Sequence, residues 1–186
     1  MGTAVYKKNA IRKTGLPVSL LLWIHFASGQ IHPVARESSV QFTIHNFGFR
    51  VSGSLAAPEG DIRFQPDSLS KSFFHVTIPS ESINTDNNSR DEHLKAADYF
   101  DVKNFPLIRF VSDHIQAANT KGEYTAVGRL TIKNKSKDIQ LPFTAEKNGN
   151  GYLFSGSFKM NRRDFDVGGS STLSNELTVE IKVLAR

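Results

Sequence analysis

The side chains best suited to catalysis lie mid-chain, where Arg90, Asp91 and His93 follow one another closely. A histidine beside a carboxylate can act as a general base. The chain has no cysteine, however, and no serine or second carboxylate stands at a spacing that completes a mechanism. We therefore expect Arg90 and Asp91 to tie a helix to neighbouring loops, and predict a protein without catalytic residues that is not an enzyme.

The histidines beyond residue 29 do not follow a metal-ligand spacing. They are His32, His45, His75, His93 and His114. None forms His-x-His or His-x-x-x-His, and cysteine ligands are absent from the sequence, so we predict no metal site. We predict no cofactor either. A second charged group, at residues 162–164, has two interpretations: it places charge against a ligand headgroup, or it forms a surface ion pair with the region of Asp91.

The segment from Ser82 to Phe110 is the part of the sequence that reads as helical. Ser89 and Glu92 have the spacing of a capping box at a helix start. Pro106 ends the segment and favours an extended conformation at the residue before it. The segment carries too many aromatic and aliphatic residues for a free loop, so we expect it to pack down like a lid.

Alternating apolar and polar residues over most of the remaining chain predict antiparallel strands at short spacing. About eight strands are expected, which indicates an all-β sandwich or closed barrel. Pro58 to Gly60 is interpreted as a turn, with 61–64 returning as the hairpin partner of 51–56. Charged outward faces favour a soluble barrel over a transmembrane one. The alternation predicts these inward-facing, candidate ligand-binding residues: Phe42, Ile44, Phe74, Val76, Ile78, Phe110, Leu141, Phe143, Phe154, Phe158, Val179 and Ile181.

The first 29 residues have the pattern of a secretory signal peptide: a basic start, an apolar run over 16–26 and small residues at 27–29. The apolar run is shorter than a membrane span requires, so we expect cleavage, no remaining membrane span and a periplasmic or secreted product. The whole chain carries 23 Lys and Arg against 18 Asp and Glu; loss of the four bases in residues 1–29 leaves 19 against 18. That near balance argues against a nucleic-acid partner.

Several motifs together resemble the YceI-like family, a lipocalin-like family of bacterial polyisoprenoid-binding proteins. The most specific are Arg90-Asp-Glu-His-Leu94, Tyr99-Phe-Asp101 and Phe105-Pro-Leu-Ile-Arg-Phe110. The pieces at 60–66, 82–85, 128–132 and 161–165 continue the resemblance over nearly all of residues 30–186. Two positions depart from the family pattern, because Asn134 and Asp166 stand where glycine is common.

The resemblance implies an extended eight-stranded antiparallel lipocalin-like barrel with a short helical insert near one end. It also implies a tunnel that holds a polyisoprenoid, an isoprenoid quinone or a similar amphiphilic lipid, and a protein that carries or stores this ligand. Members of the family often pair, so a homodimer is a further expectation. The insert and the 161–175 loop are the candidate gates of the tunnel.

Two other functions stay open from the residues alone. Alternating apolar faces are explained equally well by a filled barrel, which would serve as a non-enzymatic stress-response or interaction module. An enzyme that acts on a lipid inside the barrel would need a nucleophile and its base side by side within the cavity.

Overall fold

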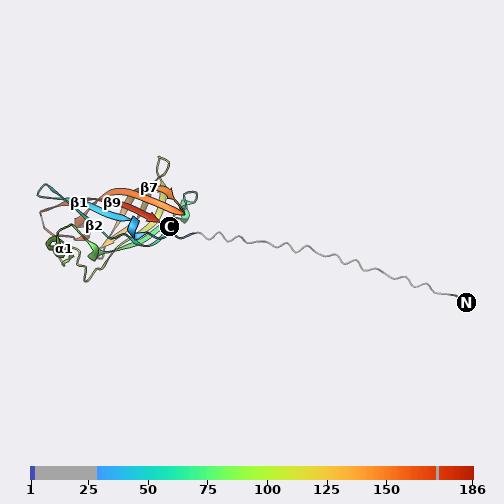
Figure 1. Ribbon diagram of the computed structural model, residues 1–186, viewed down its shortest axis with the longest axis horizontal. Helices are drawn as coiled ribbons and strands as arrows, with labels where there is room; N and C mark the ends of the chain where they lie inside the picture. Colours follow the sequence, from blue (N-terminus) through green and yellow to red (C-terminus); the bar gives the residue numbers. More distant parts are fainter. Residues whose placement is uncertain (3–28, 171) are drawn as a thin grey trace.

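The computed structural model describes residues 1–2, 29–170 and 172–186 and shows one continuous antiparallel sheet (Figure 1). The predicted signal peptide lies almost entirely outside these residues, so it stays a prediction. The nine strands are β1 (Ser39–Asn46), β2 (Phe49–Leu55), β3 (Glu59–Arg63), β4 (Phe73–Pro79), β5 (Leu107–Ala117), β6 (Glu123–Ile132), β7 (Lys135–Asn148), β8 (Gly151–Asn161) and β9 (Leu173–Ala185).

The strands are joined in the order β2-β1-β9-β8-β7-β6-β5-β4-β3. The all-β antiparallel prediction is confirmed, but the count is nine rather than eight, and β2 and β3 form the two edges of a curled sheet instead of one closed ladder. The predicted hairpin of 51–56 with 61–64 is wrong: β3 pairs with β4, not with β2. Gly60 lies inside β3, where an added Cβ would stand 2.3 Å from the His75 carbonyl oxygen. Glycine at position 60 therefore allows two strands to approach closely and does not form a turn.

Two short segments link the edges of the curled sheet. The chain before β1 forms bridges from Ile31 to Ile62 of β3 and from Pro33 to Ala185 of β9. On the other edge, Ser54 of β2 exchanges backbone hydrogen bonds with Asn84, at 2.7 and 3.0 Å. The sheet therefore wraps around an interior although β2 and β3 do not pair with each other in the described ladders.

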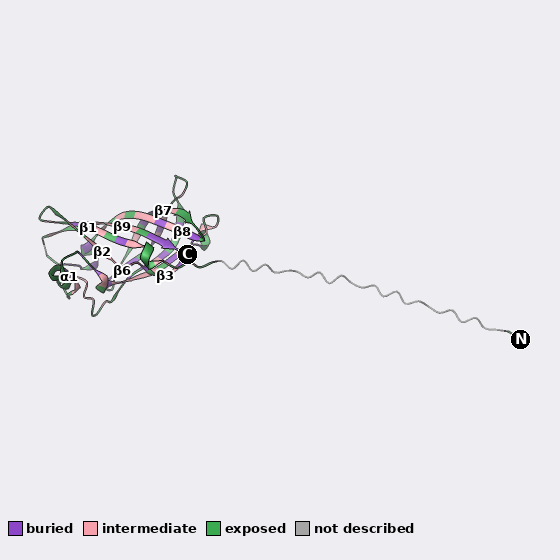
Figure 2. Ribbon diagram, in the orientation of Figure 1, coloured by how far each residue is buried: buried purple, intermediate pink, exposed green. Residues whose placement is uncertain are grey.

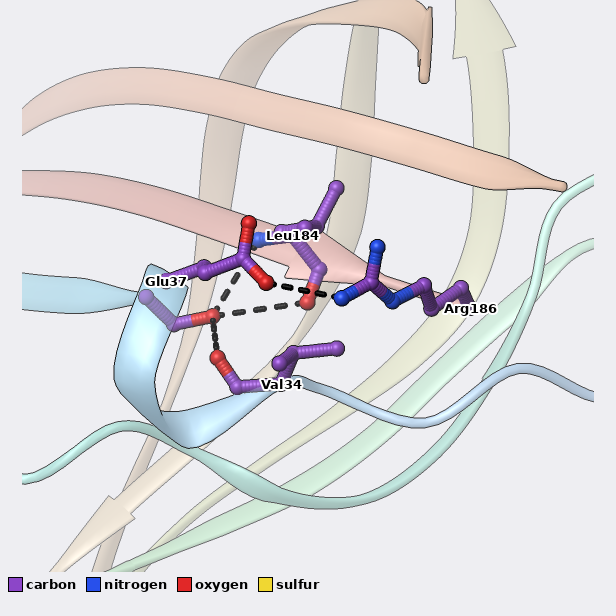
Figure 3. Close-up of polar contacts among 5 residues, drawn as sticks. Val34, Glu37, Leu184 and Arg186 are labelled. Atoms are coloured by element: carbon purple, nitrogen blue, oxygen red, sulfur yellow. Dashed lines mark hydrogen bonds and ion pairs between the residues drawn. The ribbon is translucent and has the colours of Figure 1, made fainter. Parts of the chain in front are cut away.

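Side chains hold the first of these segments in place (Figure 3). The Ser38 hydroxyl donates to the Val34 carbonyl at 2.8 Å and accepts from the Leu184 amide at 3.1 Å. Beside it, Glu37 and Arg186 form an ion pair at 2.7 Å. The carboxyl end of β9 is thus fixed to the start of the folded chain.

The helix α1 (Asn88–Lys95) lies at the end of the sheet away from the C-terminus (Figure 1), which we call the helix end. The prediction of a helical insert is confirmed, but its cap is Asn87, whose side chain accepts from the Arg90 amide at 3.0 Å. Asparagine is a strong cap, and it places Ser89 inside the first turn instead of before it. Four 3₁₀ turns complete the described helices: Ala35–Glu37, Leu69–Lys71, Ser80–Ser82 and Arg162–Phe165.

Buried residues concentrate on the strands, whereas α1 and the turns are mostly exposed (Figure 2). Near the C-terminus, aromatic rings pack into one cluster with centroid separations of 5.0 to 6.0 Å, mostly edge to face. This geometry is the one that aromatic quadrupoles favour. The aromatic cluster consists of Phe64, Phe74, Tyr124, Phe143, Tyr152 and Phe154. It fills the sheet interior at the end opposite to α1.

Candidate ligand-binding cavity

The other half of the interior holds a cavity of about 450 Å³. Its walls come from strands on all sides of the curled sheet, and α1 and the loop before β9 contribute to it as well. The volume lies within the range of roughly 300 to 1,000 Å³ usual for small-molecule sites. All twelve residues predicted to face inward line this cavity, so the strand alternation placed their side chains on the correct side.

The aromatic cluster forms the floor of the cavity. Phe74, Phe143 and Phe154 line the cavity and contact one another. Phe143 and Phe154 also contact Phe64 behind them. The side walls are made by residues that are only partly buried, among them Phe42, Val76, Phe158, Val179 and Ile181. The predicted set therefore divides into a packed floor and an accessible wall.

Other wall residues belong to the same strand faces and were omitted from the predicted set. They include Val40, Val51, Leu55, Ile108, Leu130, Ile132, Ile139, Met160 and Leu177. The period-two alternation that selected their neighbours would have selected these residues as well. The residues of the insert and of the loop, by contrast, have no comparable sequence signal.

Polar lining groups gather at the helix end, which we call the mouth of the cavity. They are Asn46, Thr85, Arg90, His93, Arg162 and Thr172. The tip of the β1–β2 hairpin is joined to the opposite loop here, because the Thr172 hydroxyl donates to the Asn46 side-chain oxygen at 2.7 Å. The apolar cavity thus has one polar end.

Arg90 and Asp91 tie α1 to the loop that precedes it, as the sequence predicted. Asp91 is 8 % exposed and accepts from the Thr85 amide at 2.9 Å and from the Thr85 hydroxyl at 2.5 Å. Arg90 donates to the Thr85 hydroxyl at 2.7 Å and to its carbonyl at 2.8 Å. Both side chains therefore bind the segment that leads into α1.

Arg162 does not form the ion pair that was one of its two predicted roles; the other role, facing a ligand headgroup, stays a prediction for a residue that lines the cavity. It is 5 % exposed, and its guanidinium donates to the backbone carbonyls of Val167 at 2.6 Å, Ser174 at 2.9 Å and Leu173 at 3.1 Å. The ion pair expected with the region of Asp91 is wrong, because the guanidinium instead satisfies the buried carbonyls of its own loop. Burial, followed by the charge of Arg163, lowers the pKa of Arg162, while Tyr99 raises it. Arginine remains charged despite such shifts.

The insert and the loop before β9 contact each other directly. The Gly168 amide donates to the Asp98 carbonyl at 2.8 Å, and Lys133 bridges the carbonyls of Ala97 and Asp166 at 2.9 and 3.1 Å. Asp166 and Asn134, the two departures from the family pattern, take left-handed conformations with φ of 54° and 59°. Both residues keep the left-handed backbone that glycine adopts readily, Asn134 in the β6–β7 turn and Asp166 in the loop before β9.

His93 lies against the Tyr99 ring, with centroids 4.9 Å apart. Within residues 29–170 and 172–186, no three or more His, Asp or Glu side chains are grouped as metal ligands. In the same part of the chain, no helix has the length and apolar character needed to cross a bilayer.

The chain is thus an all-β protein in which a curled antiparallel sheet surrounds an apolar cavity with polar side chains at one end. Residues 31–185 match the sequence model of the YceI-like domain. The chain therefore belongs to the YceI-like family, as its motifs indicated.

Relatives and solved structures agree with this membership. A UPF0312 protein of Vibrio cholerae is 24 % identical over 190 residues, covering 91 % of this chain and 98 % of the relative. The crystal structure of Burkholderia cenocepacia BcnA superposes with a TM-score of 0.76 at 24 % identity, covering 81 % of this chain and 98 % of BcnA. A polyisoprenoid-binding domain from Saccharophagus degradans gives a TM-score of 0.69 at 10 % identity, covering 84 % of this chain and 97 % of that domain. These two likenesses show the fold.

Proposed function

We propose that this protein binds a polyisoprenoid, an isoprenoid quinone or a similar amphiphilic lipid and carries or stores it outside the cytoplasm. The observation that carries the proposal is the cavity of about 450 Å³, walled by apolar side chains and polar at one end. The Saccharophagus domain of the same fold, described as polyisoprenoid-binding, supports the ligand class.

The size and lining of the cavity favour an apolar ligand over water. A dry cavity of about 150 Å³ lined by Leu, Ile and Phe binds benzene. The present cavity has about three times that volume, and its walls below the mouth are almost entirely aliphatic or aromatic. Burial of a chain against such walls stabilises a complex by roughly 25 cal/mol per Å² before the cost of ordering the ligand.

The distribution of polar groups favours a ligand with a polar head and an apolar tail. The tail would lie against the aromatic floor, and the head would remain at the mouth beside Arg90, His93 and Asn46. Arg90 uses its Nε and one terminal nitrogen on Thr85 and is exposed, so the guanidinium can also face a bound oxygen. A quinone carbonyl or a prenyl phosphate supplies an oxygen of this kind.

The described residues offer less support for an enzyme acting on a lipid. The polar lining groups bind backbone or one another rather than forming a serine and histidine pair within hydrogen-bond reach. A filled barrel, the other function considered, does not fit an interior with this cavity.

The first experiment is mass spectrometry of organic extracts from residues 30–186, which contain every described strand and α1. The protein is purified from a periplasm and, in a second arm, incubated with isoprenoid quinones and polyprenyl lipids. We expect a stoichiometric isoprenoid in at least one arm. Extracts without lipid in both arms would contradict the proposed function.

A pair of tryptophan variants makes the test specific to the cavity. Val179 lines the cavity, whereas Lys182 lies three positions along β9 and is exposed. Val179→Trp fills part of the cavity and should lower lipid retention at least about tenfold, since it removes room for several buried methylene groups. Lys182→Trp adds the same side chain outside and should retain lipid as the parent protein does. Equal retention by both variants would place the ligand elsewhere.

A further inference from the structure

The β1–β2 hairpin ends in two exposed aromatic side chains. Phe47 is 75 % and Phe49 is 76 % exposed, and they flank Gly48 at the tip. Exposed aromatic residues next to each other on a hairpin tip are costly in water unless another surface covers them. Phe47 also has a φ of 50°, a conformation that a bulky residue rarely adopts and that glycine or asparagine would take with less strain.

The tip adjoins the mouth of the cavity. Ile44, Asn46 and Val51, on both arms of the same hairpin, line the cavity. Asn46 is also bonded to Thr172 on the loop that Arg162 organises. A surface that covers the two phenylalanines would therefore lie next to the opening through which a cavity ligand enters.

The charge around the tip fits an anionic surface. Residues 39–55 contain no Asp or Glu, and they carry His45 and Arg50, which face each other across the two strands. Arg163 is exposed on the neighbouring loop, where it donates to the Gly169 carbonyl. Aromatic side chains with flanking basic groups are typical of the interface of a membrane that contains anionic lipids.

We propose that the β1–β2 hairpin docks the protein on an anionic lipid bilayer, with Phe47 and Phe49 inserted at the interface and the mouth of the cavity held against the membrane. The docking does not depend on which ligand occupies the cavity. It would let an amphiphile pass between membrane and cavity without crossing water.

The first test is co-sedimentation of residues 30–186 with vesicles of phosphatidylcholine alone or of phosphatidylcholine mixed with phosphatidylglycerol. We expect binding to the mixed vesicles that weakens as salt is raised. The double variant F47S/F49S should bind at least about tenfold more weakly, because it removes two buried aromatic side chains. The Leu107→Ser control removes an apolar residue that is 42 % exposed on another strand and should bind as the parent does.

The second test locates the contact with a single fluorophore. The one tryptophan of the sequence is Trp23, so residues 30–186 contain none. When mixed vesicles are added, the fluorescence emission maximum of the tryptophan in Phe47→Trp should shift to shorter wavelength. Its quenching by iodide should decrease. The tryptophan of Asn119→Trp, on the exposed β5–β6 turn away from α1, should keep its emission wavelength and its iodide quenching when vesicles are added.

Parent binding equal to that of F47S/F49S would overturn the proposal, as would vesicle responses of the same size from both tryptophan reporters. A third contrary result is size-exclusion chromatography in which the parent is a dimer and F47S/F49S a monomer, since the tip would then be covered by a second copy. Lipid retention by F47S/F49S in solution reports separately on the cavity, so a failure of docking is distinguishable from a failure of the proposed function.

Discussion

Arg162 shows how one buried charge can organise a loop without an ionic partner. Among the described residues its guanidinium has no carboxylate within ion-pair distance, and it bonds the carbonyl oxygens of Val167, Leu173 and Ser174. A planar group with five donors suits this arrangement, because each carbonyl receives its own hydrogen. The charge thus supports the mouth of the cavity through the backbone.

Replacement of Arg162 should therefore be severe. Arg162→Met removes the charge-assisted donors of one buried and two part-buried hydrogen bonds to carbonyls, and we expect a loss of about 3 kcal/mol in the free energy of unfolding. Arg162→Lys keeps the charge but has fewer hydrogen-bond donors, so its free energy of unfolding should fall by less. Arg163→Met, next to it on an exposed side chain, should change the free energy by no more than about 0.5 kcal/mol. Urea denaturation measures all three, and equal effects at 162 and 163 would refute the role given to Arg162.

At the scale of elements, polar contacts within the insert at 82–110 fix the start of α1. α1 has only eight residues and one buried side chain, Asp91, so its own helical stability is small. The bonds from Asp91 and Arg90 to Thr85, with the Asn87 cap, fix the entry into the helix. The insert lies at the mouth through other contacts: Tyr99 and Phe100 pack against the core, and the Asp98 carbonyl accepts from the Gly168 amide.

Asp91→Asn tests this account of the insert. The amide keeps one acceptor oxygen but loses the charge that strengthens both bonds from Thr85, so we expect a loss of about 1 to 2 kcal/mol in the free energy of unfolding. Hydrogen exchange of the amides at 85–95 should accelerate in the same variant. The matched Glu92→Gln changes an exposed carboxylate paired with Lys95 and should cost less than about 0.5 kcal/mol. An unchanged rate of hydrogen exchange at 85–95 in Asp91→Asn would contradict the role of Asp91 in fixing the start of α1.

For the whole molecule, the aromatic cluster and the cavity divide the interior between two tasks. Edge-to-face rings fill the interior near the C-terminus and stabilise the sheet. The interior toward the helix end contains the cavity. The segment before β1 closes the filled end through Ser38 and the Glu37–Arg186 pair. The packed rings and most of the cavity wall thus occupy different parts of one sheet and meet at Phe74, Phe143 and Phe154.

A ligand that fills the cavity should stabilise the whole fold, because it binds the native state alone. At a free concentration one hundred times its Kd, a bound lipid adds about 2.7 kcal/mol. For a domain of this size that corresponds to a rise in Tm of roughly 5 to 10 °C. Thermal unfolding with and without an isoprenoid quinone measures the shift. Val179→Trp should show little of it, and an equal rise in that variant would indicate binding outside the cavity.

The sequence by itself determined the strands and their inward faces, because a side chain in a strand alternates with period two and the interior must be apolar. Phe42, Phe110 and Val179 were placed in this way. Its motifs also determined the family. These are local properties, legible in a few consecutive residues.

Only the tertiary structure decided which inward residues fill the interior and which surround the cavity. Phe154 joins the packed floor while Phe158, four residues along the same strand, borders open space. The partner of β3 was decided in the same way, as were the bonds of Arg162 to its loop. Each depends on which distant strand or loop lies opposite. The neighbours of a side chain across the interior cannot be inferred from the residues beside it in the sequence.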